Sequence, residues 1–180
     1  GSYGNWTTTG DAFGSGPYTG TYWNGSNIGN GSVMSYYLGG SGSDGRQGTL
    51  TSPLFKVERN YISFKIGGGG GANTCIELLD SAGTVLVVNT AGSQSSLVPG
   101  TFDVTAYAGQ NVRIRIRDEE SGGWGWIGID HIVHTDNSMH VIKPLEVAQN
   151  GLFTAKDMAL SNGQFASEQI KLETAISGLV

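Results

Sequence analysis

The chain has 180 residues, a formal net charge of −5 at pH 7, and only 14% charged residues. Such an acidic chain lacks the basic face that a nucleic-acid partner requires, and no apolar run reaches the roughly 18 residues that a membrane-spanning helix needs. It contains 30 glycines but only four prolines, a composition typical of short strands joined by scattered turns.

The first third of the chain predicts short strands separated by long glycine-rich loops. Residues 5–9 are polar apart from Trp6, and residues 10–32 form a long loop of the kind that is usually functional or wraps an edge. We expect a strand over residues 33–38 and a flexible loop over residues 39–48. A further strand over residues 49–57 contains Pro53, which confines it to a sheet edge or a bulge.

The middle of the chain has the alternation of half-buried strands. In residues 61–66, Ile62, Phe64 and Ile66 share one face. The glycines at 67–71 precede an apolar strand and not a helix, which favours close backbone approach over a phosphate cradle. Residues 74–79 should pair with residues 84–89, and strands at 101–104 and 111–117 frame another turn. Seven or more short strands predict an all-β, jelly-roll-like antiparallel β-sandwich.

The single cysteine and three glycosylation sequons bear on thiol reactivity and on the cellular location of the protein. Cys75 lies in an apolar run, where we expect a small buried hydrophobe and not a nucleophile. Three Asn-X-Ser/Thr sequons, at Asn5, Asn24 and Asn30, are compatible with an exported glycoprotein, although no signal peptide opens the chain. We therefore expect an extracellular or cell-surface protein.

The most informative stretch is residues 113–130. Arginines 113, 115 and 117 alternate with apolar residues, and Asp118, Glu119 and Glu120 follow before a glycine-flanked Trp124. Carboxylates, guanidinium groups and an exposed indole suit sugar recognition, because hydroxyls need charged partners and sugar C–H faces pack on aromatics. The alternative is that Trp124 belongs to the core and the charges form a solvated edge.

The order of motifs resembles family 66 carbohydrate-binding modules over about residues 3–133. The resemblance rests on Trp6, Gly109 and Asp118 and on the motifs at residues 10–17, 48–55, 62–69, 102–104, 113–116, 122–125 and 129–132. It implies a sandwich that binds terminal fructose units of levan-type fructans and is often attached to family 32 glycoside hydrolases. The sugar-binding residues that it implies are Asp44, Arg46, Glu119 and Trp124, with Glu77 as a weaker candidate.

The resemblance also implies a metal site. Related sandwiches hold one structural calcium between an acid of the first strand and an aspartate of the last, and Asp130 fits the second ligand. The first-strand acid is missing here, as is a histidine that relatives have where this chain has Trp126. The calcium site would therefore need backbone carbonyls. His131, His134 and His140 are expected to be surface or packing residues and not zinc ligands.

Residues 138–180 lie outside the resemblance and predict a C-terminal extension to a sandwich domain of residues 1–137. Alternation over residues 169–176 favours a strand, with a helix over residues 166–177 as the competing prediction. An apolar strand must dock, either on its own sandwich or on a neighbouring subunit by strand addition, which would build a homo-oligomer or filament. A third interpretation is a domain boundary within a larger enzyme.

Catalysis is not expected. Asp118 and Glu120 are adjacent acids on a turn, which are usually solvated, and the chain has no Ser-His-Asp pattern. The sequence thus predicts a non-catalytic carbohydrate-binding module with a polysaccharide partner. The alternative is a structural subunit of an extracellular filament.

Overall fold

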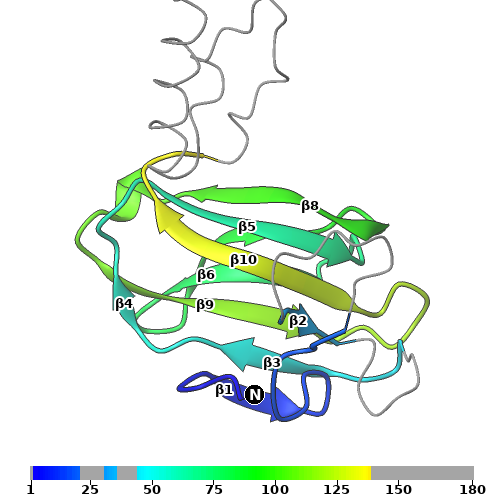
Figure 1. Ribbon diagram of the computed structural model, residues 1–180. Helices are drawn as coiled ribbons and strands as arrows, with labels where there is room; N and C mark the ends of the chain where they lie inside the picture. The colour runs from blue at the N-terminus through cyan, green and yellow to red at the C-terminus, as the bar shows by residue number, and fades with distance from the viewer. Residues whose placement is uncertain (1, 21–30, 36–43, 139–180) are drawn as a thin grey trace, which may run out of the picture.

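The protein forms two antiparallel sheets that pack face to face, as predicted from the sequence. The computed structural model describes residues 2–20, 31–35 and 44–138 (Figure 1). The larger sheet has the order β1-β3-β9-β6-β7, with β4 also paired to β9, and the smaller has the order β2-β10-β5-β8. The larger sheet contains β1 (Thr7–Gly10), β3 (Gly48–Thr51), β4 (Phe55–Lys56), β6 (Thr74–Asp80), β7 (Val85–Asn89) and β9 (Asn111–Asp118). The smaller sheet contains β2 (Val33–Met34), β5 (Tyr61–Gly68), β8 (Gln94–Asp103) and β10 (Ile127–Thr135).

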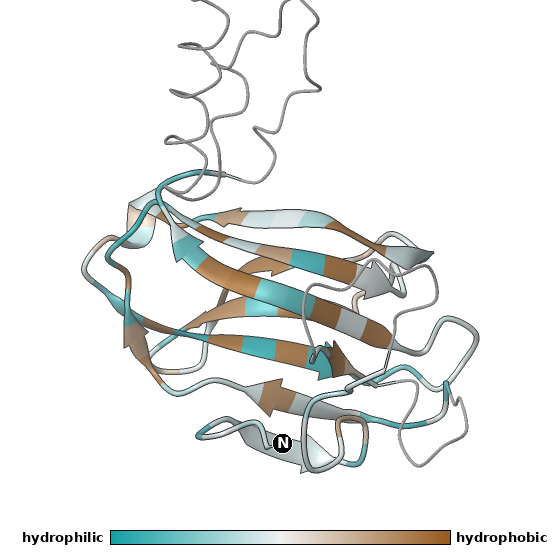
Figure 2. Ribbon diagram, in the orientation of Figure 1, coloured by the Kyte–Doolittle hydropathy of each residue, from teal (hydrophilic) through white to brown (hydrophobic). Residues whose placement is uncertain are grey.

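The core lies between the sheets because strands such as β5 and β9 alternate apolar residues, which face inward, with more polar ones. Figure 2 shows this as brown and teal bands along the strands. In β5, Ile62, Phe64 and Ile66 are all buried, and the Phe64 ring meets Phe102 of β8 edge-on at 5.0 Å between ring centroids. In β9, Val112, Ile114 and Ile116 face the same interior, so the arginines between them occupy the outer face of the larger sheet.

Glycines allow backbones to approach closely at the ends of the strands. Gly68 has φ +114, and a Cβ there would collide with the backbone of Trp126, the residue before β10. Gly100 in β8 lies against the Phe64 ring, which a Cβ would overlap. Within the glycine run at residues 67–71, Gly68, Gly69 and Gly70 therefore serve close approach of neighbouring chain segments, as the sequence indicated.

Several strand boundaries differ from the prediction. The predicted strand over residues 49–57 is two strands, β3 and β4, with Pro53 between them; a proline has no N–H to donate to a ladder. The strand predicted at residues 101–104 begins at Gln94, although Pro99 and Gly100 interrupt its pattern. The pairing of residues 74–79 with 84–89 is confirmed as β6 with β7.

Some predictions fall on residues outside the described ranges. The strand over residues 33–38 is described only as β2, because residues 36–43 are outside. The C-terminal extension, apart from Ser138, is also outside, and with it the predicted strand, its docking and the filament. Asn5 is exposed, whereas Asn24 and Asn30 lie outside. Cys75 is a free, buried cysteine, as expected.

Within the described part of the chain, no helix is long and apolar enough to cross a membrane.

Candidate functional site

The candidate site lies at one end of the sandwich, where β9 ends and β10 begins. The connecting residues 119–126, called here the Trp124 turn, lie beside residues 44–47, which precede β3 (Figure 1). The Gln47 side-chain Nε2 donates a hydrogen bond to the Glu119 carbonyl oxygen at 2.7 Å, and the Trp124 N–H donates to Asp44 Oδ2 at 3.2 Å. Two loops far apart in sequence therefore form one polar rim.

Trp124 is an exposed aromatic platform on this rim. Its side chain is 44% exposed, so the interpretation of Trp124 as a core residue is wrong. The indole stacks on that of Trp126, with ring centroids 6.1 Å apart and planes at 23°. Trp126 is buried against Met34 and Leu97. Trp124 also has φ +68, an uncommon conformation for a bulky residue, which is held by the surrounding contacts.

Glu119 and Arg46 are partly exposed at the same end of the sandwich. The Glu119 carboxylate is 49% exposed and accepts a hydrogen bond from Arg117 Nη1 at 3.2 Å. Arg46 is 31% exposed, and its Nη1 lies 3.9 Å from Asp11 Oδ2. Because residues 44–48 run alongside residues 118–125, these two opposite charges lie on the rim that carries Trp124.

Glu77 lies elsewhere, on the outer face of the larger sheet. Its side chain is only 2% exposed and is covered by two arginines of β9. Arg115 Nε donates to its carboxylate at 2.6 Å, and Arg117 Nη2 approaches at 3.0 Å. A ligand would have to displace both guanidinium groups to reach Glu77, so we leave it out of the binding residues proposed below.

The sequence did not predict the burial of Asp118. We expected adjacent solvated acids, but Asp118 is fully buried. Its pKa is raised to about 6, mainly by burial and also by the charges of Asp44 and Glu120, and this is the net value after the opposing effect of the Ser35 hydroxyl and the Glu120 N–H. Continuing the alternation of β9 by one step would have placed Asp118 on the buried face.

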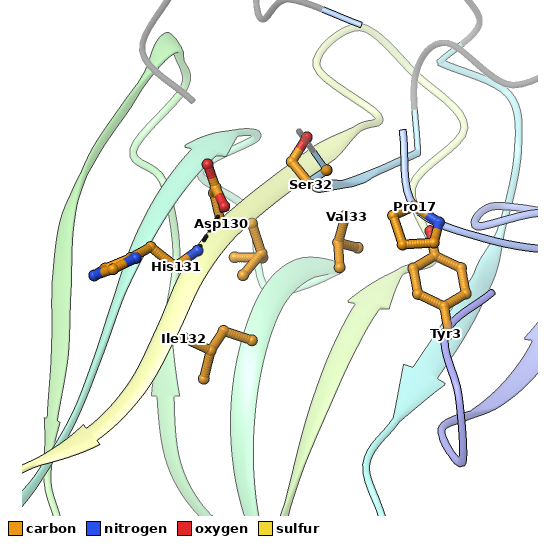
Figure 3. Close-up of a pocket in the computed structure, with 9 residues that line it drawn as sticks. Tyr3, Pro17, Ser32, Val33, Asp130, His131 and Ile132 are labelled. Carbon is orange, nitrogen blue, oxygen red and sulfur yellow. Dashed lines mark hydrogen bonds between the residues drawn. The ribbon is translucent and has the colours of Figure 1, made fainter. Parts of the chain in front are cut away.

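Asp130 lies away from the Trp124 turn, on β10 of the smaller sheet. It is 7% exposed, and its Oδ1 accepts a hydrogen bond from the His131 N–H at 2.7 Å. It lines a pocket of about 190 Å³ with Tyr3, Val33 and Ile132 (Figure 3). This volume is below that of most small-molecule sites.

Metal ligands are sparse in the described ranges. No group of three or more His, Cys, Asp and Glu residues there could hold a metal ion. Calcium at Asp130 therefore requires backbone carbonyl oxygens and stays a prediction.

Comparison with known proteins gives one similar sequence and several distant folds. The chain is 33% identical over 131 residues to the Aspergillus rugulosus protein named "Putative glycosyl hydrolase ecdE". The match covers 71% of this chain but only 18% of that protein. No family model matches the chain, so membership of family 66 stays a prediction.

Three solved structures illustrate the distant folds. TmCBM61, solved with beta-1,4-galactotriose, is 15% identical with TM-score 0.47, over 73% of this chain and 88% of that chain. The K1 cleaved adhesin domain of Lys-gingipain from Porphyromonas gingivalis W83 is 17% identical with TM-score 0.44, over 71% and 88%. CBM35 from Cellvibrio japonicus Abf62 is 13% identical with TM-score 0.35, over 72% and 97%.

Proposed function

We propose that this domain is a non-catalytic glycan-binding module whose ligand stacks on Trp124. The observation that carries the proposal is an indole that is 44% exposed and fixed from two sides. Asp44 holds its backbone N–H and Trp126 supports its ring. A platform held in this way loses little conformational entropy when a sugar face packs on it.

Charged groups on the rim would hold the sugar hydroxyls. Arg46 and Glu119 supply a donor and an acceptor beside the indole, and hydrogen bonds to charged groups contribute about 1.5–3 kcal/mol each. Asp44 acts through the Trp124 N–H that it holds, because its other carboxylate oxygen is buried. The ligand that the family 66 resemblance favours is a terminal fructose unit of a fructan or a related exposed glycan. The sequons and this ligand class favour an extracellular or cell-surface location.

The similarity to the Aspergillus protein is in keeping with an accessory role. This chain corresponds to only 18% of a protein named as a glycosyl hydrolase. A module of this size would bring a hydrolase to its polymer and leave the chemistry to another domain.

A catalytic role for the acids of the rim is disfavoured by their geometry. A glycosidase needs two carboxyl groups that flank one accessible bond. Asp118 is fully buried, and Glu120 Oε1 accepts the N–H groups of Ser121 and Gly122 at 3.1 Å each. The two therefore cannot face a common substrate bond.

Affinity electrophoresis in gels that contain levan, inulin or an unrelated glucan tests the proposal. We expect retardation by a fructan, and at least a tenfold loss of affinity, about 1.4 kcal/mol, for Trp124→Ala and for Asp44→Ala. Val88→Ala is the matched control for the indole, because Val88 is 48% exposed on β7. Glu58→Gln controls for charge, because Glu58 is exposed next to β4, which pairs with the opposite end of β9.

Two results would overturn the proposal. One is migration that no polysaccharide alters. The other is retardation that persists undiminished in Trp124→Ala, since the ligand would then bind elsewhere. Hydrolysis of a fructan by the purified chain would contradict the non-catalytic part.

A further inference from the structure

Asp118 is buried at the rim end of the space between the two sheets. It is the last residue of β9 and pairs with Gly48 of β3 on one side and Thr74 of β6 on the other. It continues the inward-facing series of Val112, Ile114 and Ile116, so its carboxylate points between the sheets. The residue has no exposed surface.

The Asp118 carboxylate is poorly compensated by the described residues. The Ser35 hydroxyl and the Glu120 N–H lower its pKa, but neither forms a hydrogen bond of ordinary geometry with it. Neither Oδ1 nor Oδ2 has a hydrogen-bond partner there, and no ion pair includes it. The nearby Ser35 hydroxyl is already engaged with Ile127, accepting its N–H at 2.8 Å and lying 3.3 Å from its carbonyl oxygen. A buried carboxylate without compensation is costly, and native proteins rarely keep one.

More oxygen atoms from the two neighbouring loops lie around Gly125, at the same end of the sandwich as Asp118. Asp44 Oδ2 accepts the Trp124 N–H, but its Oδ1 is buried and has no partner among the described residues. Residues 44–47 lead into Gly48, which pairs with Asp118, so the two aspartates lie at the same end of the sandwich. A Cβ on Gly125 would lie 2.7 Å from the carbonyl oxygens of Glu120 and Gly122, and closer still to that of Asp44.

We propose that a divalent cation of the calcium type binds beneath the Trp124 turn, held by the carboxylates of Asp118 and Asp44 with backbone carbonyl oxygens. All the candidate ligands are oxygens, which suit hard cations and not zinc. Calcium accepts carboxylates, carbonyls and water in irregular shells of six to eight, whereas magnesium requires a near-ideal octahedron. Backbone carbonyl oxygens and water would therefore complete the shell around the two carboxylates.

This site is distinct from the calcium expected at Asp130. Asp130 Oδ1 already accepts a hydrogen bond and lies on β10 in the smaller sheet. Asp118, at the end of β9, and Asp44, on the loop before β3, instead present three buried carboxylate oxygens without hydrogen-bond partners in the described ranges. A cation there would join residue 44 to the start of the Trp124 turn and so hold the indole in place.

Isothermal titration calorimetry on the EDTA-treated protein, with calcium chloride and then magnesium chloride, tests the inference. We expect one calcium per chain, magnesium binding at least tenfold weaker, and a rise in Tm with calcium. Asp118→Asn and Asp44→Asn should each weaken calcium binding at least tenfold. Glu58→Gln, which removes an exposed charge at the opposite end, should not.

Circular dichroism shows whether each variant is folded. Asp118→Asn removes an uncompensated buried charge, so this variant should fold without calcium. The inference is overturned if the wild-type protein binds no calcium at millimolar concentration. It is also overturned if Asp118→Asn binds calcium as tightly as the wild type does.

Repeating the polysaccharide gels with EDTA or calcium separates this inference from the glycan-binding proposal. Fructan retardation without calorimetric calcium binding would overturn the cation site and leave the glycan site standing. Calcium binding that depends on Asp118, without retardation by any polysaccharide, would support the cation site and overturn glycan binding.

Discussion

The ion pairs of Glu77 with two arginines of β9 provide a strong test of whether this glutamate stabilises the fold or binds a ligand. Glu77→Gln keeps the shape of the side chain but removes the charge that both Arg115 and Arg117 contact. Removing one partner of a fully buried ion pair costs about 3–5 kcal/mol. Because the two arginines are 29% and 23% exposed, solvent screening lowers this, and we expect a loss of about 2 kcal/mol.

Urea unfolding at pH 7, followed by tryptophan fluorescence, measures this loss. For a chain of this size it corresponds to a fall in Tm of roughly 4–8 °C. Glu119→Gln is the matched control, because Glu119 contacts the same Arg117 but is 49% exposed, and it should change stability by less than about 0.5 kcal/mol. Fructan affinity should respond in the opposite way, falling in Glu119→Gln and staying unchanged in Glu77→Gln.

The assignment of Glu77 to stability fails if Glu77→Gln is as stable as the wild type. It also fails if Glu77→Gln loses fructan affinity while keeping its stability, since Glu77 would then act as a ligand and not as a structural ion.

Three further predictions concern buried groups. In EDTA, the free energy of unfolding should fall by up to about 3 kcal/mol as the pH rises from 4 to 7, because burial raises the pKa of Asp118 from 3.8 to about 6 and the folded state therefore binds the extra proton; urea titrations of Asp118→Asn should lack this decline. Gly125→Ala should destabilise the protein by about 1–3 kcal/mol in the same assay, because its Cβ would meet three backbone carbonyl oxygens that cannot easily move; wild-type stability would contradict the packing of the turn. Cys75 should react slowly with Ellman's reagent in the native protein and fully in urea, because burial raises the pKa of its thiol; rapid native labelling would contradict its burial.

The fold was predictable where alternation was unbroken. Ile62, Phe64 and Ile66 identified β5 because a half-buried strand must place every second side chain in the core. The start of β8 was not predictable, because Pro99 and Gly100 are poor strand formers. They are tolerated there because β8 is an edge strand and Gly100 makes room for the Phe64 ring.

The candidate site was predictable only in part. The glycines around Trp124 indicated an exposed indole, and the structure confirms that exposure. Sequence spacing could not separate Glu77 from the rim, because its burial depends on two arginines of a neighbouring strand. The contact between Asp44 and Trp124 joins residues 80 positions apart, and no local pattern encodes it.

The stacked indoles of Trp124 and Trp126 give the protein a built-in optical signal. Two chromophores 6.1 Å apart with planes at 23° couple electronically, so their excitons should produce a paired positive and negative band in the far-ultraviolet circular dichroism spectrum. Any event that shifts the outer ring relative to the inner one would change that couplet. Events at this end of the molecule can thus be followed in solution without attaching a dye.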